Sequence, residues 1–462
     1  MTDISEPICA IITPPGYAAI NVIRISGKGS IGIVAQYFKP RKKLLNSPSH
    51  RVVFGTFHTK EGRAIDQVLC TVFRAPYSYT GEDVVEISSH GNPQIASQIL
   101  ENLLLDARMA NPGEFTLRAV LNGKMDLPQA EAVNDLVFAS GAMAESAALM
   151  QVQGILSQHL QKLLDDISDT RLRCELAIDF ADQDLPPVNP EDLKNRIANL
   201  LKQAEELYAE GTTQGKYIRE GIKICLVGPT NSGKSSLFNA LLKYSRAIVN
   251  PQPGTTRDYL EERVNLQGYT IILYDTAGLR MSSDEIEKEG IERTRELMDY
   301  ADLILYLLPV DQEINQREID ELAPDIKNKT LWVASKYDLI NPDLYTIKNL
   351  DILDGHLPDF AIPASVYVPN GLEKLQQEIL NHFALPQKWV DRPLVTNARH
   401  LAALSRAISS LQNALQSIEN QAGYEFTAFD LIATSQALEE ILGIVTTEDL
   451  LTNIFNNFCI GK

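Results

Sequence analysis

The segment "IKICLVGPTNSGKSSLFNALL" restricts the fold of this chain more than any other. An apolar run predicts a buried strand, residues 228–235 match G-x-x-x-x-G-K-S, and a helical pattern follows. Gly228 and Gly233 allow the loop to curl, so that its backbone N–H groups and the positive end of the next helix face phosphate oxygens. Lys234 would reach the β and γ phosphates, and the Ser235 hydroxyl would ligate Mg²⁺. A chance glycine-rich turn is the alternative, but the placement between strand and helix favours a phosphate-binding loop.

Three later motifs narrow the nucleotide to GTP. "GTTRD" contains Thr256, which is placed to complete the Mg²⁺ shell. "DTAG" offers Asp275, which can hold Mg²⁺ through a water molecule, and the Gly278 amide, which can sense the γ phosphate. In "SKYD", Lys336 can pack on a purine ring, and Asp338 can accept hydrogen bonds from the ring N–H and exocyclic amine of guanine. Each motif is weak alone, but their order and spacing together predict a GTPase.

Two positions depart from the usual GTPase pattern. Ser335 stands where GTPases usually carry asparagine, which removes one guanine contact and predicts weaker affinity with unchanged base choice. Leu279 follows "DTAG" where Ras-like enzymes carry the glutamine that orients the attacking water. Another group must therefore orient that water.

The rest of the chain changes pattern three times. Residues 1–120 hold short strand-like runs broken by glycine and proline, which predict a small α+β domain. Residues 121–220 and 384–462 carry helical periodicity, whereas residues 221–383 alternate compact apolar strands with helices. A compact domain can be inserted into another without breaking its core. The pattern therefore predicts a multidomain protein with an α+β N-terminal domain, an all-α helical domain and an inserted α/β Ras-like P-loop G domain.

Composition limits the partners and the compartment. The net charge of −18 argues against a general basic surface for nucleic acid, so any RNA contact must be local or supplied by a partner. The five cysteines are scattered and never form CxxC, which predicts neither a disulfide framework nor a zinc site and fits a reducing cytoplasm. The N-terminus lacks signal-peptide features, and the most apolar run, "ADLILYLLPV", is about half the length that crosses a bilayer. We expect no membrane span.

The chain resembles the MnmE (TrmE) family of tRNA-modification GTPases over essentially its whole length. The resemblance rests on "ITPPG", "VIRISG", "SYTGEDVVEISSHG", "PGEFTLRAVLNGKMDLPQAEAV", "GPTNSGKSSLFNAL", "PGTTRD", "DTAGLR" with "DEIEKEGIERT", and the final "FCIGK". It implies a cytoplasmic homodimer whose N-terminal domain dimerises and binds a tetrahydrofolate derivative, 5-formyl- or methylene-tetrahydrofolate. It also implies a heterotetramer with the flavoprotein MnmG (GidA), which carries FAD and through which tRNA is mainly bound. Together they would add an aminomethyl or carboxymethylaminomethyl group to C5 of the wobble uridine.

The resemblance further implies that K⁺ activates the GTPase when two G domains meet. It assigns K⁺ to Asn231, Asn250, Gln252 and Thr255, where the ion supplies the charge that an arginine finger gives other GTPases. Glu287 would position the attacking water through a second water, although without the family it would be read as a solvated acid. Mg²⁺ would lie on Ser235 and Thr256, and Arg280 would be a switch-region residue or an ordinary surface charge. The GTP-binding residues would be Asn231, Ser232, Gly233, Lys234, Ser235, Ser236, Asn250, Pro251, Gln252, Pro253, Gly254, Thr255, Thr256, Asp275, Thr276, Ala277, Gly278, Ser335, Lys336 and Asp338.

The resemblance also connects the two ends of the chain. It assigns folate to Arg24, Glu86, Lys124 and Lys462, because cations can pair with the folate tail or pterin carbonyl and a carboxylate can accept the pterin amine and ring N–H. It implicates Cys459 in the modification reaction. From the residues alone, prenylation is disfavoured because the final two residues do not fit C-a-a-X, a metal site lacks a second ligand, and packing at a helix end stays open.

Two other function classes remain open on the sequence. A ribosome-assembly or RNA-chaperone GTPase usually appends a basic RNA-binding module, and neither flank of the G domain shows one. A one-carbon transferase with a regulatory G domain is also compatible with the N-terminal domain.

Overall fold

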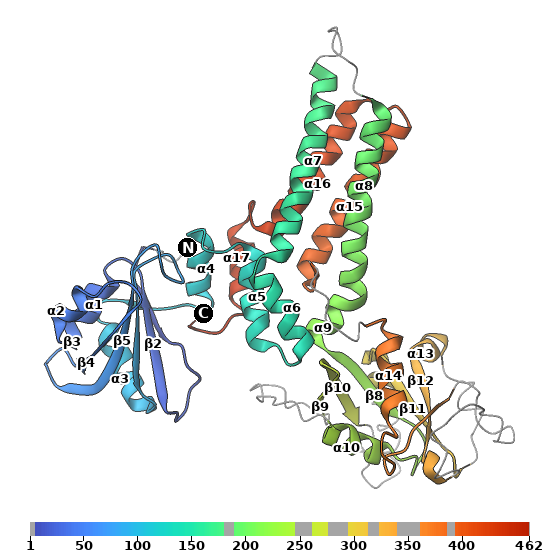
Figure 1. Cartoon of the computed structure of the whole chain (residues 1–462), viewed down its shortest axis with the longest axis horizontal. Helices are drawn as coiled ribbons and strands as arrows, with labels where there is room; N and C mark the ends of the chain where they lie inside the picture. Colours follow the sequence, from blue (N-terminus) through green and yellow to red (C-terminus); the bar gives the residue numbers. More distant parts are fainter. Residues whose placement is uncertain are drawn as a thin grey trace. The chain divides into compact units, whose positions relative to one another are not determined.

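The chain divides into two compact units. Figure 1 labels the helices and strands of both. Unit 1 comprises residues 1–134, 151–169 and 432–462, and unit 2 comprises residues 135–150 and 170–431. The computed structural model describes residues 5–179, 189–244, 261–275, 294–312, 323–339, 361–385 and 393–461.

A seven-stranded sheet in the order β3-β4-β5-β6-β2-β1-β7 forms the N-terminal domain of unit 1. Neighbouring strands are antiparallel except the parallel pair β1–β7. The predicted strand-like runs "AIITPPG", "INVIRISG", "RVVFGTFHT", "QVLCTVFRAP" and "DVVEISSHGN" overlap β1, β2, β4, β5 and β6. Strands β3 and β7 span two residues each, too few for an alternating pattern. The strands are β1 (Ile8–Ile11), β2 (Ile20–Ser26), β3 (Phe38–Lys39), β4 (Arg51–His58), β5 (Ala64–Phe73), β6 (Val84–His90) and β7 (Arg108–Met109).

Helices supply the other layer of this domain's core. Helix α1 (Ser30–Tyr37) and helix α3 (Pro93–Leu103) bury their apolar faces in one cluster with the inward side chains of the sheet, such as Ile23, Val72 and Ile87. The side chain of Asn92 accepts from the Gln94 N–H and caps α3. Helix α2 (Arg41–Leu45) and helix α4 (Glu114–Leu121) complete the α+β arrangement.

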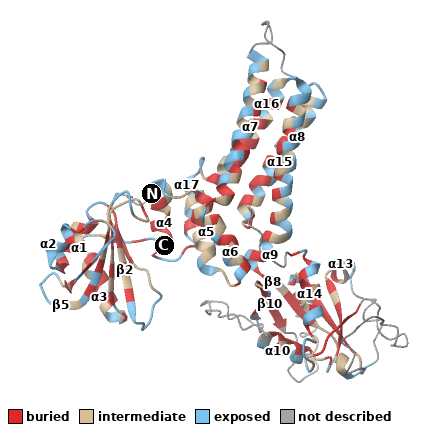
Figure 2. Cartoon of the chain, in the orientation of Figure 1, coloured by how far each residue is buried: buried red, intermediate tan, exposed pale blue. Residues whose placement is uncertain are grey.

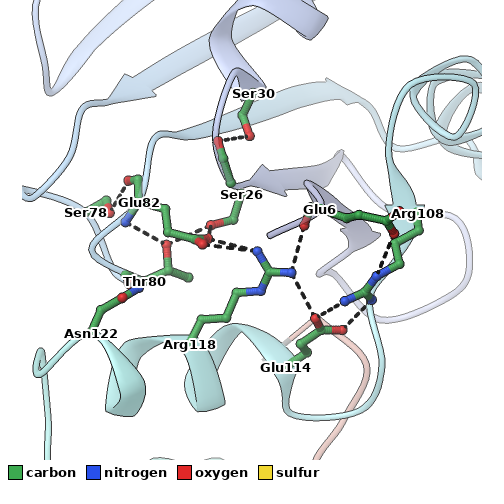
Figure 3. Close-up of polar contacts among 11 residues, drawn as sticks. Glu6, Ser26, Ser30, Ser78, Thr80, Glu82, Arg108, Glu114, Arg118 and Asn122 are labelled. Carbon is green, nitrogen blue, oxygen red and sulfur yellow. Dashed lines mark hydrogen bonds and ion pairs between the residues drawn. The ribbon is translucent and has the colours of Figure 1, made fainter. Parts of the chain in front are cut away.

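An ionic network is buried where α4 meets the sheet (Figure 3). The Arg118 guanidinium, only 1% exposed, donates to both carboxylate oxygens of Glu82 at 3.1 and 3.3 Å, to Glu114 Oε1 at 3.0 Å and to the carbonyl of Glu6 at 2.8 Å. Arg108 donates to both oxygens of Glu114. The network therefore joins α4 to β7, to the chain before β1 and to the loop before β6.

The hydrogen bonds of this network act on the Glu114 carboxyl group. Burial alone would raise the pKa of Glu114, but the bonds from Arg108, the Asn111 N–H and Arg118 together outweigh it, and the pKa lies below its ordinary value of 4.5. A carboxyl group whose pKa is lowered on folding stabilises the folded state above its unfolded pKa. That contribution is lost as the pH falls through the lower, folded pKa.

Replacing Glu114 by glutamine is expected to destabilise the N-terminal domain by about 3 kcal/mol, because Arg108 and Arg118 lose the charged group that compensates their burial. The stabilities of variant and wild type should converge as the pH falls through the lowered, folded pKa of Glu114, where the wild-type carboxyl group becomes protonated. Hydrogen exchange of β6 and α4, followed from pH 7 downward until the two proteins give equal protection, measures this. Glu101→Gln, on the exposed face of α3, is the matched control. Equal protection of α4 in Glu114→Gln and the control at pH 7 would contradict the prediction.

Helices follow the N-terminal domain, as predicted, and several of them are long. They are α5 (Leu127–Phe138), α6 (Ala142–Val152), α7 (Ile155–Asp179), α8 (Pro190–Glu210), α9 (Lys216–Glu220), α15 (Ala398–Glu419), α16 (Tyr424–Leu442) and α17 (Glu448–Phe455). Within unit 2, α8 and α15 pack along their buried faces, and the side chains of Asn189 and Asn397 cap their N-termini. No helix in the described parts of the chain is long and apolar enough to cross a membrane.

The G domain of unit 2 contains a six-stranded sheet in the order β13-β12-β11-β8-β10-β9. All neighbours are parallel except β9, which pairs antiparallel with β10 at the edge. The apolar runs "IKICLVG", "TIILYDTAG", "ADLILYLLPV" and "KTLWVASKYD" form β8, β10, β11 and β12, as their pattern predicts, and Figure 2 shows buried residues in β8 and β10. The strands are β8 (Ile222–Val227), β9 (Glu261–Leu266), β10 (Tyr269–Asp275), β11 (Leu303–Pro309), β12 (Thr330–Ser335) and β13 (Ile362–Pro363).

The described helices of the G domain are α10 (Lys234–Tyr244), α13 (Pro324–Asn328) and α14 (Glu373–His382). The two ends of the domain lie together, since the rings of Tyr217 and Phe383 have centroids 4.5 Å apart. This proximity is what the insertion of one domain into another requires.

Candidate functional site

The phosphate-binding loop connects β8 to α10 and needs its unusual backbone. Gly228 has φ +147°, and a Cβ atom there would lie 2.6 Å from the Leu307 carbonyl oxygen, so no side chain fits. Asn231 and Gly233 have φ angles of +59° and +92°. These left-handed positions curl the loop in front of the N-terminus of α10, as phosphate binding requires.

The Lys234 side chain folds back over this loop. It is 8% exposed, and its Nζ donates to the carbonyl oxygens of Gly228 and Pro229, each at 2.7 Å. Ser235 is exposed in the first turn of α10. A buried ammonium group, a helix N-terminus and a neighbouring hydroxyl fit a polyphosphate with its Mg²⁺ ion.

A cavity of about 260 Å³ adjoins the loop at the ends of β12 and β13. The Asp338 carboxylate lies in the 3₁₀ turn Tyr337–Leu339, and Lys336 Nζ donates to both Asp311 oxygens at 2.8 and 3.1 Å. An apolar pocket with a carboxylate at its wall fits a purine that carries donors on its edge. The cavity is lined by Gly233, Ser236, Leu237, Asp311, Ser335, Lys336, Asp338, Leu339, Ala364, Val366 and Tyr367.

Ser335 links the base cavity to the phosphate loop. Its hydroxyl, in a side chain that is 6% exposed, donates to the Ser232 carbonyl oxygen at 2.7 Å. The residue that replaces the usual asparagine therefore keeps a structural contact between the two loops.

Ser365 was not identified from the sequence. Its hydroxyl donates to Asp338 Oδ1 at 2.6 Å and accepts from the Tyr367 N–H at 3.2 Å. These bonds fix the orientation of the Asp338 carboxylate. It follows the two-residue strand β13, and a lone serine after so short a strand gives no signal in the sequence.

The remaining nucleotide-site predictions are only partly described. Asp275 ends β10, and its backbone lies in register with Leu226 of β8, so it reaches the same sheet edge as the phosphate loop. Nothing is described of the Asp275 side chain. Asn250, Pro251, Gln252, Pro253, Gly254, Thr255, Thr256, Thr276, Ala277, Gly278, Arg280, Glu287 and Lys462 lie outside the described residues.

Arg24 and Glu86, predicted as folate residues, form a cross-strand ion pair in unit 1. They lie opposite each other on β2 and β6, and Arg24 Nε and Nη2 donate to Glu86 Oε1 at 2.9 and 2.7 Å. The guanidinium carbon lies 5.4 Å from the Tyr79 ring centroid and 5.5 Å from that of Phe115. Both charged side chains stay partly exposed, at 16% and 27%, so the pair can reach a ligand.

Lys124 lies at the loop that carries Tyr79. Its Nζ donates to the Pro76 carbonyl at 3.1 Å, and its Cγ lies 3.3 Å from where a Gly81 Cβ atom would stand. Arg24 and Lys124 therefore both contact the segment 76–81, and Glu86 is paired with Arg24.

The C-terminal tail, residues 456–461, packs on the same domain. The Gly113 N–H, at the start of α4, donates to the Cys459 carbonyl at 3.4 Å, and Phe458 is buried with Phe455. A Cβ atom on Gly461 would lie 3.1 Å from the Ile11 carbonyl oxygen at the end of β1. Phe458 does the packing, whereas the Cys459 thiol is exposed.

The tail ends at β1, the strand that pairs with the Arg24-bearing strand β2. Within the β1–β2 pair, Ile11 lies opposite Ile23, and Ala10 lies opposite Arg24. The structure thus places the tail backbone at the end of β1, in the same sheet as Arg24 and Glu86.

Comparison with known proteins identifies the family of the chain. The family model described as the MnmE helical domain matches residues 127–459, and the one described as the GTP-binding protein TrmE N-terminus matches residues 7–124. The tRNA modification GTPase MnmE of Aquifex aeolicus is 40% identical over 462 residues, which cover 99% of this chain and 100% of that relative. The chain belongs to the MnmE family of tRNA modification GTPases. It is accordingly a GTPase.

A second MnmE relative supports the same assignment. The tRNA modification GTPase MnmE of Alkaliphilus metalliredigens is 39% identical over 464 residues, covering 99% of this chain and 100% of the relative. Among solved structures, the G domain of the T. maritima FeoB iron transporter is 27% identical over 35% of this chain and 98% of that chain. Its TM-score is 0.24, so this likeness adds nothing to the family assignment.

Ser335→Ala is expected to weaken GDP binding by roughly five- to tenfold, because the Ser232 carbonyl in the phosphate loop loses its buried donor at a cost of about 1 to 1.5 kcal/mol. Titration with a fluorescent GDP analogue measures the effect. Ser409→Ala, which removes an exposed hydroxyl from α15, serves as the control. An unchanged dissociation constant for Ser335→Ala would show that the two loops hold their positions without this bond.

Proposed function

We propose that this MnmE-family chain is a K⁺-activated GTPase that modifies tRNA together with the flavoprotein MnmG (GidA). The pair adds an aminomethyl or carboxymethylaminomethyl group to C5 of the wobble uridine of certain tRNAs, using a folate-borne one-carbon unit. The carrying observation is the packing of the Cys459 tail, through Gly113 and Gly461, on the domain that holds Arg24 and Glu86. A GTPase that only assembles ribosomes does not need an exposed thiol held on this domain.

The nucleotide site supplies the GTPase part of the proposal. Lys234 and the loop N–H groups hold the phosphates, and Ser235, Thr256 and, through water, Asp275 hold Mg²⁺. Asn231 is exposed in the loop, which supports a role as a K⁺ ligand together with Asn250, Gln252 and Thr255. Glu287 positions the attacking water.

Unit 1 supplies the folate part. The Arg24–Glu86 pair stands against two aromatic rings, an arrangement that fits a flat, polar-edged pterin ring. Glu86 accepts from the ring edge, Arg24 pairs with a carbonyl, and Lys124 and Lys462 hold the glutamate tail. Bound 5-formyl- or methylene-tetrahydrofolate supplies the carbon.

The net charge of the chain bears on how tRNA is bound. A chain of net charge −18 is poorly suited to hold tRNA alone, so tRNA binds mainly through MnmG, which also carries FAD. The chain works as a cytoplasmic homodimer through its N-terminal domain and as a heterotetramer with MnmG.

GTP hydrolysis is expected to be much faster in KCl than in NaCl at equal ionic strength. Asn231→Gly should abolish this difference and still bind GDP, because glycine accepts the left-handed φ of +59° while removing only the side chain. Asn239→Ala, on an exposed position of α10, is the control. Equal rates of the wild type in both salts would rule out the K⁺ mechanism.

Cys459→Ser is expected to keep GTP hydrolysis and to lose the modified uridine. The variant is expressed in a strain that lacks the protein, and tRNA nucleosides are measured by mass spectrometry. Ile460→Ala, which trims an exposed tail residue, should restore modification. Unchanged nucleosides in the deletion strain, together with defective ribosomal subunits, would instead favour a ribosome-assembly GTPase.

A further inference from the structure

Residues 135–150 leave unit 1 and pack within unit 2. The chain belongs to unit 1 up to Asn134 and again from Gln151. This α5–α6 excursion contains the end of α5, the corner at Ala139–Gly141 and most of α6. It is joined covalently to unit 1 at both ends.

The corner of the excursion packs against the β9–β10 hairpin. The Met143 N–H donates to the Gly268 carbonyl at 3.0 Å, and the hydroxyl oxygens of Ser140 and Thr270 lie 2.9 Å apart. A Cβ atom on Gly141 would lie 2.7 Å from the Gly268 carbonyl oxygen and 2.8 Å from Thr270 Oγ1. The two backbones therefore approach as closely as glycine allows.

Two further contacts fasten the excursion. Met143 and Ala147, 8% and 3% exposed, belong to the same hydrophobic cluster as the strands of the G-domain sheet. The Asp135 carboxylate accepts from Arg219 Nε at 3.1 Å and Nη2 at 3.0 Å, and Arg219 lies in α9, shortly before β8. The excursion is thus built into the core of the G domain.

The chain continues from both ends of this hairpin to residues proposed to hold Mg²⁺. Strand β9 begins at Glu261, shortly after Thr256 in the sequence, and β10 ends at Asp275. Both flanking residues are proposed to serve Mg²⁺. A change in that ion's surroundings on GTP hydrolysis therefore acts on a hairpin whose turn is held by α6.

We propose that the α5–α6 excursion couples GTP hydrolysis to unit 1, with Ser140, Gly141 and Met143 as positioning residues. The excursion follows the hairpin because it shares the G-domain core, and it acts on unit 1 through the helices α5 and α6. The inference rests on the proposed function, since it names how that GTPase reaches the domain that carries Cys459.

The test uses Gly141→Ala in the full-length protein. The added methyl group must push the corner away from the hairpin, because one obstructing atom is a backbone carbonyl. GTP hydrolysis should stay within about twofold of wild type, while modified uridine per GTP hydrolysed falls about tenfold, in the range of couplings between sites. The control is Gly32→Ala in α1, where no heavy atom of the described chain lies within 4 Å of the new Cβ.

A second readout separates this inference from the proposed function. Hydrogen exchange in residues 155–169 of α7 is compared between the GDP form and the form with GDP and aluminium fluoride. Wild type and Gly32→Ala should show a difference that Gly141→Ala loses. Ser140→Ala deletes one hydrogen bond only and is the second variant to use if Gly141→Ala folds poorly. It should lose part of the exchange difference.

The outcomes are distinct. The coupling would be overturned if Gly141→Ala kept the exchange difference and modified uridine normally. It would also be overturned if hydrogen exchange in the wild type were the same in both nucleotide forms. Suppose that the wild type shows an exchange difference between the two nucleotide forms, that Gly141→Ala loses this difference, and that the wild type modifies no uridine. This result would support the coupling and refute the proposed function.

Discussion

The pairing of β8 with both β10 and β11 is the constraint on which the nucleotide site depends. Parallel strands end at the same edge of a sheet, so this pairing brings the phosphate loop and Asp275 together. Strand β11 then aligns β12, with Pro309 opposite Ser335, which carries the base-recognition loop to the same edge. The close approach of the Leu307 carbonyl makes Gly228 obligatory. One register therefore fixes the phosphate loop, the base loop and the bond between them.

The N-terminal domain depends on a polar contact in a comparable way. Burying Arg118 and its acidic partners costs solvation energy, so the network is weak evidence for stability and better evidence for a defined geometry. Glu114 begins α4 directly after Gly113, whose N–H holds the tail. The network thus fixes the end of α4 on which the Cys459 segment packs.

The sequence predicted the features that depend on neighbours along the chain. The phosphate loop and the four central strands follow from local pattern, because glycine positions and apolar runs act within a few residues. The Ser335–Ser232 bond joins positions 103 apart, and Ser365 reaches Asp338 only after β13 pairs with β12. Such contacts depend on register, which periodicity does not contain. The folate residues came from family resemblance alone, since a charge beside a strand carries no signal of its own.

The division of the chain also could not be predicted, and it bears on how the two sites communicate. The helical pattern of "AMAESAALM" is correct for α6, but small residues do not say which core they will enter. The four boundaries between the units fall within α5, α6, α7 and α16. A loop absorbs a displacement in its own dihedral angles, whereas a helix passes it along its axis because each turn is hydrogen-bonded to the next. Of these four connections, α5 and α6 are joined by the corner that holds the β9–β10 hairpin, so a change at the nucleotide reaches them first.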